Sequence, residues 1–283
     1  MNLIVGIILV MGCVIGGYLL EGGHIGALMQ PVELLIIGGA GFGAFLIANP
    51  LTLVKKTFAA VPTLLGASHY GKEKHLELLA LMYALFNKIR KDGLIALERD
   101  IDAPEQSAIF SQFPNILKDH HAIEFIADYF RLMVGGSMNA FEIENLMDVE
   151  LETHHNEAHA PIAAVQSASD ALPAFGIVAA VLGVVITMAA IGGPPAEIGH
   201  KVGAALVGTM LGILLSYGIV GPIGTALNHR LEDESRFYSC IKTSIIAYLN
   251  GYSPQVAIEF GRKVLSSEVR PGFLELEEHV KKK

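Results

Sequence analysis

Three residues inside long apolar stretches could help to move an ion across a membrane: Thr209, Pro173 and Pro222. A hydroxyl in mid-stretch, such as that of Thr209, can line an ion path, but it can equally donate a hydrogen bond to a carbonyl one turn earlier. Each proline lacks an N–H and so frees a backbone carbonyl one turn earlier, near Ser169 and Gly218. The two prolines are therefore either hinges or simple kinks, and the sequence does not separate these roles.

The apolar stretches are more informative for what they lack. Ion paths through helical membrane proteins usually contain a carboxylate, a lysine or an arginine. The sequence has four long stretches without any charged residue: 1–20, 34–54, 171–196 and 202–228. We therefore expect the chain alone to be ion-tight. Either it conducts nothing, or a partner protein contributes the titrating group.

Outside these stretches, the polar candidates favour surface roles. Arg90 and Glu98 flank a helix break at Gly93, where a solvated helix face is the simplest explanation. His155 and His159 have the i, i+4 spacing that could bind a metal from one helix face, but no third ligand is evident, so exposed histidines are favoured. No phosphate loop, nucleophile elbow or Cys-x-x-Cys motif is present. We predict no catalytic residue, no metal and no cofactor.

Each charge-free stretch is long enough to cross a hydrocarbon core of about 30 Å as a helix. The connections at 21–33 and 197–201 contain one lysine and no arginine, whereas Lys55, Lys56 and Arg230 follow the second and fourth stretches. The positive-inside rule then places both termini in the cytoplasm. We predict an all-α membrane protein with four transmembrane helices and a helical cytoplasmic domain inserted between spans 2 and 3. The expected domains are a hairpin at 1–50, the cytoplasmic domain at 51–170, a second hairpin at 171–228 and a helical cytoplasmic tail at 229–283.

The inserted domain contains most of the chain's net charge of −8, which argues against nucleic acid as a partner and favours a protein with basic patches. Periodic apolar residues predict helices over 69–91, 94–101 and 122–134. Asn139 and Glu142 have the spacing of a capping box, from which we expect one unbroken helix that reaches into the third span. A second long helix is expected between Pro222 and Gly251.

Several sequence blocks resemble the MotA branch of the MotA, TolQ and ExbB proton-channel proteins. The resemblance covers the whole chain and is most specific in its last two blocks. The blocks are GGxxGALMQPVELLIIGGAGFGAF at 22–45, LALMYALFNKIRKDGLIALERDI at 79–101, MNAFEIENLMDVELETH at 138–154, LPAFGIVAAVLGVV at 172–185, VGTMLGILLSYGIVGP at 207–222 and NGYSPQVAIEFGRKVL at 250–265.

The resemblance implies a flagellar motor stator subunit in the bacterial inner membrane. Five such chains would surround two MotB-like partners, each with one membrane helix, an intramembrane Asp and a peptidoglycan anchor. Arg90 and Glu98 correspond to the family's charged residues that face the FliG-like rotor protein. Pro173 and Pro222 correspond to its functional prolines, and Thr209 to the hydroxyl of the ion path. The histidines at 154–159 match no family feature and receive no role.

Two other functions remain open from the sequence. One is an energiser of outer-membrane machinery, as in TolQ and ExbB, and the other is a non-conducting membrane scaffold. For the stator, we expect H⁺ rather than Na⁺ as the coupling ion. Ala180 occupies the position where sodium-driven relatives have a hydroxyl, which leaves Thr209 as the one side-chain hydroxyl at that level. Thr187 is a competing candidate about two turns away, nearer the outer face.

Overall fold

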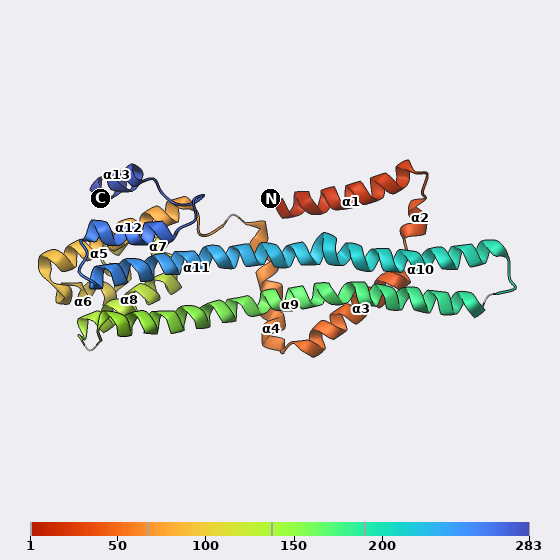
Figure 1. Cartoon of the computed structure of the whole chain (residues 1–283), viewed down its shortest axis with the longest axis horizontal. Coiled ribbons are helices and arrows are strands. Elements are labelled where there is room, and N and C mark those ends of the chain that lie inside the picture. Colours follow the sequence, from red (N-terminus) through yellow and green to blue (C-terminus); the bar gives the residue numbers. More distant parts are fainter. Residues whose placement is uncertain (1, 67, 137, 190, 283) are drawn as a thin grey trace. The chain divides into compact units, whose positions relative to one another are not determined.

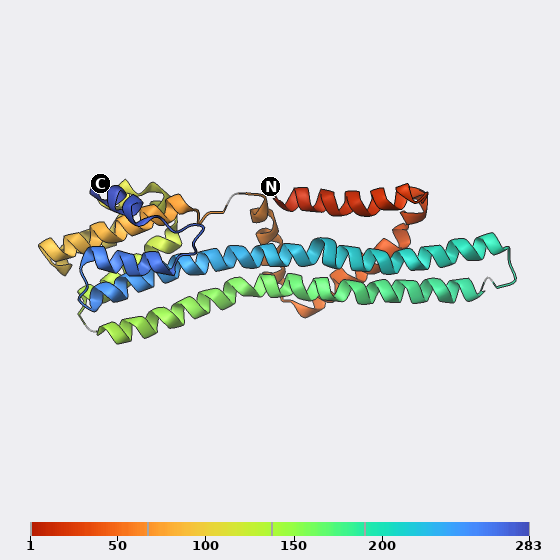
Figure 2. The same cartoon turned by 45° about the horizontal axis from the view of Figure 1, so that its top comes forward.

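The computed structural model describes residues 2–66, 68–136, 138–189 and 191–282. The regular elements in these ranges are all helical (Figures 1 and 2). They form two compact units, residues 1–67 with 157–229 and residues 68–156 with 230–283. Two long helices, α9 (Ala140–Ala189) and α11 (Gly221–Leu249), contribute residues to both units. Among the described residues, four helical segments are long and apolar enough to span a membrane, so the predicted four-span helical fold is confirmed. They are Leu3–Leu20, Ile25–Ala48, Ala140–Ala189 and Pro195–Leu249.

The first unit contains the apolar helices. Its elements are α1 (Asn2–Leu20), α2 (Ile25–Leu28), α3 (Pro31–Ala48), α4 (Leu51–Ala60), the 3-10 turn η1 (Val61–Leu65), the later part of α9, α10 (Pro195–Leu215), the π-helical turn η5 (Ser216–Val220) and the start of α11. Most large apolar side chains of α1 are exposed, as expected for surfaces that face lipid or another subunit. Helices α9 and α10 run antiparallel and side by side (Figures 1 and 2).

The second unit has a conventional hydrophobic core. Its elements are α5 (Lys72–Asp92), η2 (Leu94–Leu97), α6 (Glu98–Asp102), η3 (Pro104–Gln106), η4 (Phe110–Gln112), α7 (Pro114–Leu117), α8 (His120–Val134), the first part of α9, the later part of α11, α12 (Pro254–Val264) and α13 (Phe273–Lys282). The apolar faces of α5, α8 and α11 meet in one cluster that includes Phe86, Phe130 and Phe237, each with no exposed surface. This is a soluble-type core, because it excludes water by burying whole side chains.

The structure confirms the two continuous helices expected from the sequence. The side chain of Glu142 accepts a hydrogen bond from the backbone N–H of Asn139, and the Asn139 side chain accepts one from the N–H of Glu142, as in a capping box. From there α9 continues through Pro161 and Pro173. The helix expected at 94–101 is instead a 3-10 turn followed by the short α6. The predicted limits of the cytoplasmic domain, 51–170, concern the position of the membrane and stay a prediction.

Candidate functional site

Glycines bring α9 and α10 into backbone contact along the length of the hairpin. A Cβ atom built on Gly212 would lie 2.7 Å from the carbonyl oxygen of Leu172 and 2.9 Å from the Cα of Gly176. A Cβ built on Gly176 would lie 3.1 Å from the carbonyl oxygen of Gly208. No side chain fits at these distances, so glycine is required for this approach. Glycines leave no flexible side chains between the two backbones. A change in the packing of these helices therefore occurs in discrete steps and not by gradual adjustment of side chains.

The predicted ion-path residues lie at different levels of this hairpin. Gly208 packs against Ala179, and because α9 and α10 run antiparallel, Thr209 and Ala180 lie one residue to either side of this contact, about 3 Å apart along the hairpin. Pro173 is seven residues from Ala180 along α9, and Pro222 is thirteen residues from Thr209. At about 1.5 Å per residue these separations are about 10 and 20 Å. The structure therefore places Ala180 and Thr209 at neighbouring levels, and the two prolines progressively further along the hairpin.

A buried pair of serines lies between the two prolines and was not found by sequence reasoning. The hydroxyl of Ser169 on α9 donates a hydrogen bond to the carbonyl oxygen of Ser216, and its Oγ is 3.1 Å from the Ser216 Oγ. Ser216 has no exposed surface and begins the π-helical turn η5. Such turns leave backbone groups unevenly paired and are frequent at functional sites. The only sequence signal was the expected free carbonyl one turn before Pro173.

Hydroxyl groups on the hairpin differ in how they are satisfied. The Thr187 hydroxyl donates to the Gly183 carbonyl oxygen over 2.7 Å, so it is engaged in its own helix. Thr225 bonds in the same way to Gly221. Thr209 is half-buried and makes no side-chain hydrogen bond to the described residues. The local back-bond considered for Thr209 is therefore not formed, and its hydroxyl remains available to an ion or to water.

One candidate membrane-spanning helix begins before its charge-free stretch and so contains a carboxylate that was not expected there. Glu33 lies in the first turn of α3, after Pro31 at the start of the helix, and only 8% of its surface is exposed. Because the charge-free stretch begins at residue 34, the sequence pattern assigns Glu33 to the connection at 21–33. Proline in the first turn and an acidic residue soon after it are typical of a helix start, and this signal would have placed Glu33 correctly.

Arg90 and Glu98 lie on either side of the break at Gly93, whose φ of 84° is in the region that favours glycine. Both side chains are exposed, and neither forms an ion pair with the described residues. The neighbouring charges are paired instead, as in the contact of Lys88 with Asp100. The two residues are thus free to meet another protein, and their predicted role at the rotor stays a prediction.

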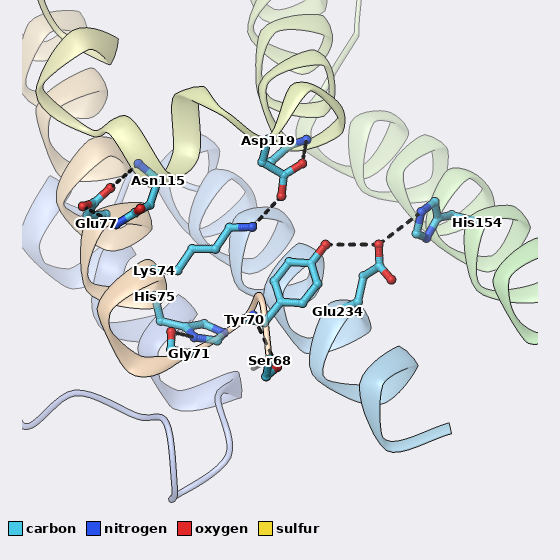
Figure 3. A network of polar contacts seen from close by, with 11 residues as sticks. Ser68, Tyr70, Gly71, Lys74, His75, Glu77, Asn115, Asp119, His154 and Glu234 are labelled. Atoms are coloured by element: carbon cyan, nitrogen blue, oxygen red, sulfur yellow. Dashed lines mark hydrogen bonds and ion pairs between the residues drawn. The ribbon is translucent and has the colours of Figure 1, made fainter. Parts of the chain in front are cut away.

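A polar network holds the start of α5 to its neighbours (Figure 3). The Lys74 ammonium contacts the Asp119 carboxylate at 2.6 Å, and the Tyr70 hydroxyl donates to Glu234 on α11 at 3.1 Å. Burial, followed by the charge of Glu234, raises the pKa of Tyr70, so its hydroxyl stays protonated. His154 lies 3.7 Å from the same carboxylate. The network fixes one end of the helix whose other end presents Arg90.

The histidine run does not form a metal centre in the described part of the chain. His154 faces Glu234 (Figure 3). The Nδ1 atom of His155 lies 3.0 Å from the Ser235 hydroxyl. No group of three or more His, Cys, Asp or Glu side chains suited to a metal ion occurs among the described residues. These histidines therefore contact α11 and do not converge on one point.

Comparison with known proteins decides the family. The chain is 49% identical to motility protein A of Salmonella typhimurium over 281 residues, which is 99% of this chain and 95% of that protein. The chain belongs to the motility protein A family. Residues 4–93 match the motility protein A N-terminal family, and residues 118–239 match the MotA/TolQ/ExbB proton channel family. The chemotaxis protein LafT of Vibrio parahaemolyticus is 39% identical, over 98% of this chain and 97% of that protein.

Solved structures support the same fold for this motility protein A family member. A structure of C. jejuni MotAB matches with a TM-score of 0.77 and 19% identity, covering 94% of this chain and 96% of that one. The flagellar MotAB stator complex from Bacillus subtilis matches with a TM-score of 0.75 and 24% identity, covering 95% and 98%. The match to the motility protein A N-terminal family covers residues 4–93, which include the first hairpin. This hairpin therefore assigns the chain to the motility branch of the wider family.

Proposed function

We propose that this chain is a flagellar motor stator subunit that forms a proton channel with a MotB-like partner and converts ion flow into torque. The observation that supports this most directly is its near full-length similarity to motility protein A. Several copies, five by the family resemblance, would surround the membrane helices of a peptidoglycan-anchored partner. The partner's Asp would supply a titrating carboxylate at the hairpin of α9 and α10.

The same proposal places the protein in the bacterial inner membrane, with both termini in the cytoplasm. Lys55 and Lys56 lie in α4, directly after the second apolar helix, where the positive-inside rule expects cytoplasmic charge. The proposal assigns no catalysis to the chain. Its chemistry would consist of proton binding and release, with no covalent bond made or broken in a substrate.

The α9–α10 hairpin supplies a structural basis for the conversion. A proton that crosses the membrane releases about 2.3 kcal/mol per 100 mV. This is enough to bias a choice between two packings that differ by a few kcal/mol, but not to unfold a helix. Neutralising the partner's carboxylate would change the charge beside Thr209. The glycine-packed helices would respond in a discrete step, with Pro173 and the π-helical turn η5 absorbing the change of backbone geometry.

The response would reach the rotor through α9 and α11. Both are continuous helices that extend from the apolar unit into the soluble unit, where the polar network and the hydrophobic core hold α5. Arg90 and Glu98 would then act on charges of the FliG-like rotor protein. Surface charges suit this role, because their interactions are long-ranged and are rapidly made and broken.

The test is proton flux through purified protein in liposomes. The chain should be reconstituted alone and with its cognate partner, after release of any plug segment in that partner, under an imposed pH gradient. Proton uptake is expected only with the partner present, and a cell that lacks the chain should regain swimming when both are expressed. Equal uptake by the chain alone, or swimming without the partner, would contradict the proposal.

A further inference from the structure

Glu33 is a buried acidic group of the apolar unit that the mechanism above leaves unused. Its surroundings within the apolar unit are hydrophobic: Ile37, one turn later on α3, packs against Leu172 and Ala179. The Oε2 atom of Glu33 is fully buried, and it makes no hydrogen bond to any described residue. An ionised carboxylate with neither a donor nor a cation is strongly disfavoured in such a place. The Glu33 carboxyl is therefore expected to bind a proton or to pair with a positive group.

The helix opposite leaves space for this carboxyl group. A Cβ atom built on Gly208 of α10 would lie 3.1 Å from Glu33 Oε2 and 3.3 Å from the Cβ of Ala179. A Cβ at position 208 would displace the carboxyl or Ala179 by a few tenths of an ångström, whereas glycine leaves both in place. Gly208 thus accommodates the Glu33 carboxyl as well as the backbone of α9.

The carboxyl also lies at the level of the ion path. Gly208, which faces the carboxyl, directly precedes Thr209, and Ala179, which packs against Gly208, directly precedes Ala180. Neighbouring residues in a helix differ by about 1.5 Å along the axis. Glu33 is therefore within about one residue's rise of the two residues expected to surround the coupling ion, although it comes from a different helix.

We propose that Glu33 is a proton-binding site of this chain itself, beside the ion path at the level of Thr209 and Ala180. This inference rests on the proposed proton-driven function. A hydronium ion on the side from which protons enter transfers a proton to Glu33 Oε2: one O–H bond of the hydronium breaks and leaves a water molecule, and the new O–H bond gives a neutral carboxylic acid. The acid then releases the proton to another water molecule, which restores the carboxylate and forms a hydronium ion for the next acceptor. The site stores one proton beside the partner's carboxylate.

Few other titratable groups lie near this site. The apolar part of α9 from 171 to 189 contains none, and α2 contains none. On α10 the nearest are Glu197, His200 and Lys201, two turns or more before Gly208, with Glu197 paired to Lys201 at 2.9 Å. On the chain before α3, His24 and the exposed Glu21 precede the helix. Glu33 is thus the titratable group closest to Thr209 among these elements.

The experiment compares wild-type complex with Glu33→Gln and Glu33→Asp, each reconstituted with the cognate partner. Infrared difference spectra between high and low pH report the carbonyl stretch of a protonated carboxyl. We expect Glu33→Gln to lose one such band and Glu33→Asp to shift it. Proton flux should fall about tenfold or more in Glu33→Gln, in line with the loss of a positioned proton-transfer group, and recover partly in Glu33→Asp. Gly208→Ala should shift the band and lower the flux less.

The matched control is Glu21→Gln, an exposed carboxylate in the turn that follows α1, which should leave spectrum and flux unchanged. If wild type conducts protons but Glu33→Gln keeps its band and pH profile, this proposal is overturned and the proposed function stands. If wild type conducts no protons, the proposed function fails first. Loss of the assembled ring in Glu33→Gln with retention in Glu33→Asp would identify an ion pair between subunits and overturn the proposal. Should neither variant assemble, an unshifted band in Gly208→Ala overturns it.

Discussion

The Ser169 hydroxyl donates a hydrogen bond to the Ser216 carbonyl oxygen over 3.1 Å, and so ties α9 to the first residue of a π-helical turn on the opposite helix. Both residues are almost fully buried, at 2% and 0% exposure. A π-helical turn has one residue more than an α-helical turn, so it can be relaxed by a small shift of register. A side chain that holds its first carbonyl therefore controls when the turn can relax.

Replacement of Ser169 by Ala should loosen this turn. The Ser216 carbonyl would lose the Ser169 donor and keep only the backbone N–H of Gly221, at a cost of about 1 kcal/mol. Ser216→Ala should cost less, because the carbonyl acceptor is in the backbone and keeps its bond to Ser169. The measurement is thermal stability of the assembled complex, together with torque of tethered cells. Equal effects of the two substitutions would show that the hydroxyl pair matters and the carbonyl bond does not. Thr225→Val is the control, since Thr225 bonds within its own helix.

Charge reversal at Arg90 or Glu98 should impair swimming without loss of assembly. Both residues are exposed and unpaired among the described residues, and exposed charges contribute at most about 1 kcal/mol to stability. Arg90→Glu and Glu98→Lys should therefore accumulate in the membrane at wild-type levels and swim slowly. A compensating charge on the rotor protein should restore speed. Lys118→Glu and Glu124→Lys, which are exposed elsewhere in the same unit, are the controls. Reduced protein levels in the reversed variants would point to a structural role.

His75 should make the soluble unit less stable in acid. Burial lowers the pKa of this imidazole, against the opposing effects of the Gly71 carbonyl and Asp233, while Lys74 lowers it further. The folded state therefore binds fewer protons than the unfolded state below the ordinary histidine pKa of about 6.5. Stability is unaffected above that pH and falls as pH drops from about 6.5 toward the folded pKa, by at most about 1.4 kcal/mol per pH unit.

The measurement for His75 is chemical unfolding of the full complex in detergent between pH 5 and 8, in the range where histidine titrates. His75→Gln should flatten the pH dependence, whatever it does to stability at neutral pH. His121→Gln should leave the pH dependence unchanged, because 84% of the His121 side chain is exposed. A wild-type slope that survives in His75→Gln would assign the acid sensitivity to another group.

Local signals in the sequence predicted the helices well. The candidate site, in contrast, is formed by contacts between helices that are far apart in the sequence. The capping box at Asn139 and the continuous helix through Pro173 follow from residues a few positions apart. The burial of Glu33 depends on Gly208, 175 residues away in the sequence, and no local pattern encodes that register. The Ser169–Ser216 bond was missed for the same reason. Small residues indicated close packing in advance, but not which glycines would meet.

Replacement of Pro222 by Leu should straighten the start of α11. Leucine restores a backbone N–H directly after the π-helical turn, and Pro222 is exposed, so little packing is lost. We expect a complex that assembles normally and generates weak torque, because the turn would be held in one geometry. Pro195→Leu is the matched control: Pro195 is also exposed, but it is in the first turn of α10, where no helical hydrogen bond is gained. Near-normal torque in Pro222→Leu would make this proline a simple kink.

The coupling ion is expected to be H⁺. A dehydrated Na⁺ needs several oxygen ligands, whereas a proton needs one titrating carboxylate. At the level of Ala180 the described hairpin offers one side-chain hydroxyl, that of Thr209, because Thr187 lies seven residues further along and donates to the Gly183 carbonyl.

The test is swimming speed with and without Na⁺ at constant proton-motive force. Speed should be unchanged without Na⁺ and abolished by a protonophore. Ala180→Ser or →Thr adds a second hydroxyl at this level, and a gain of Na⁺ dependence there would confirm the position. Wild-type speed that collapses without Na⁺ and survives the protonophore would identify a sodium-driven motor.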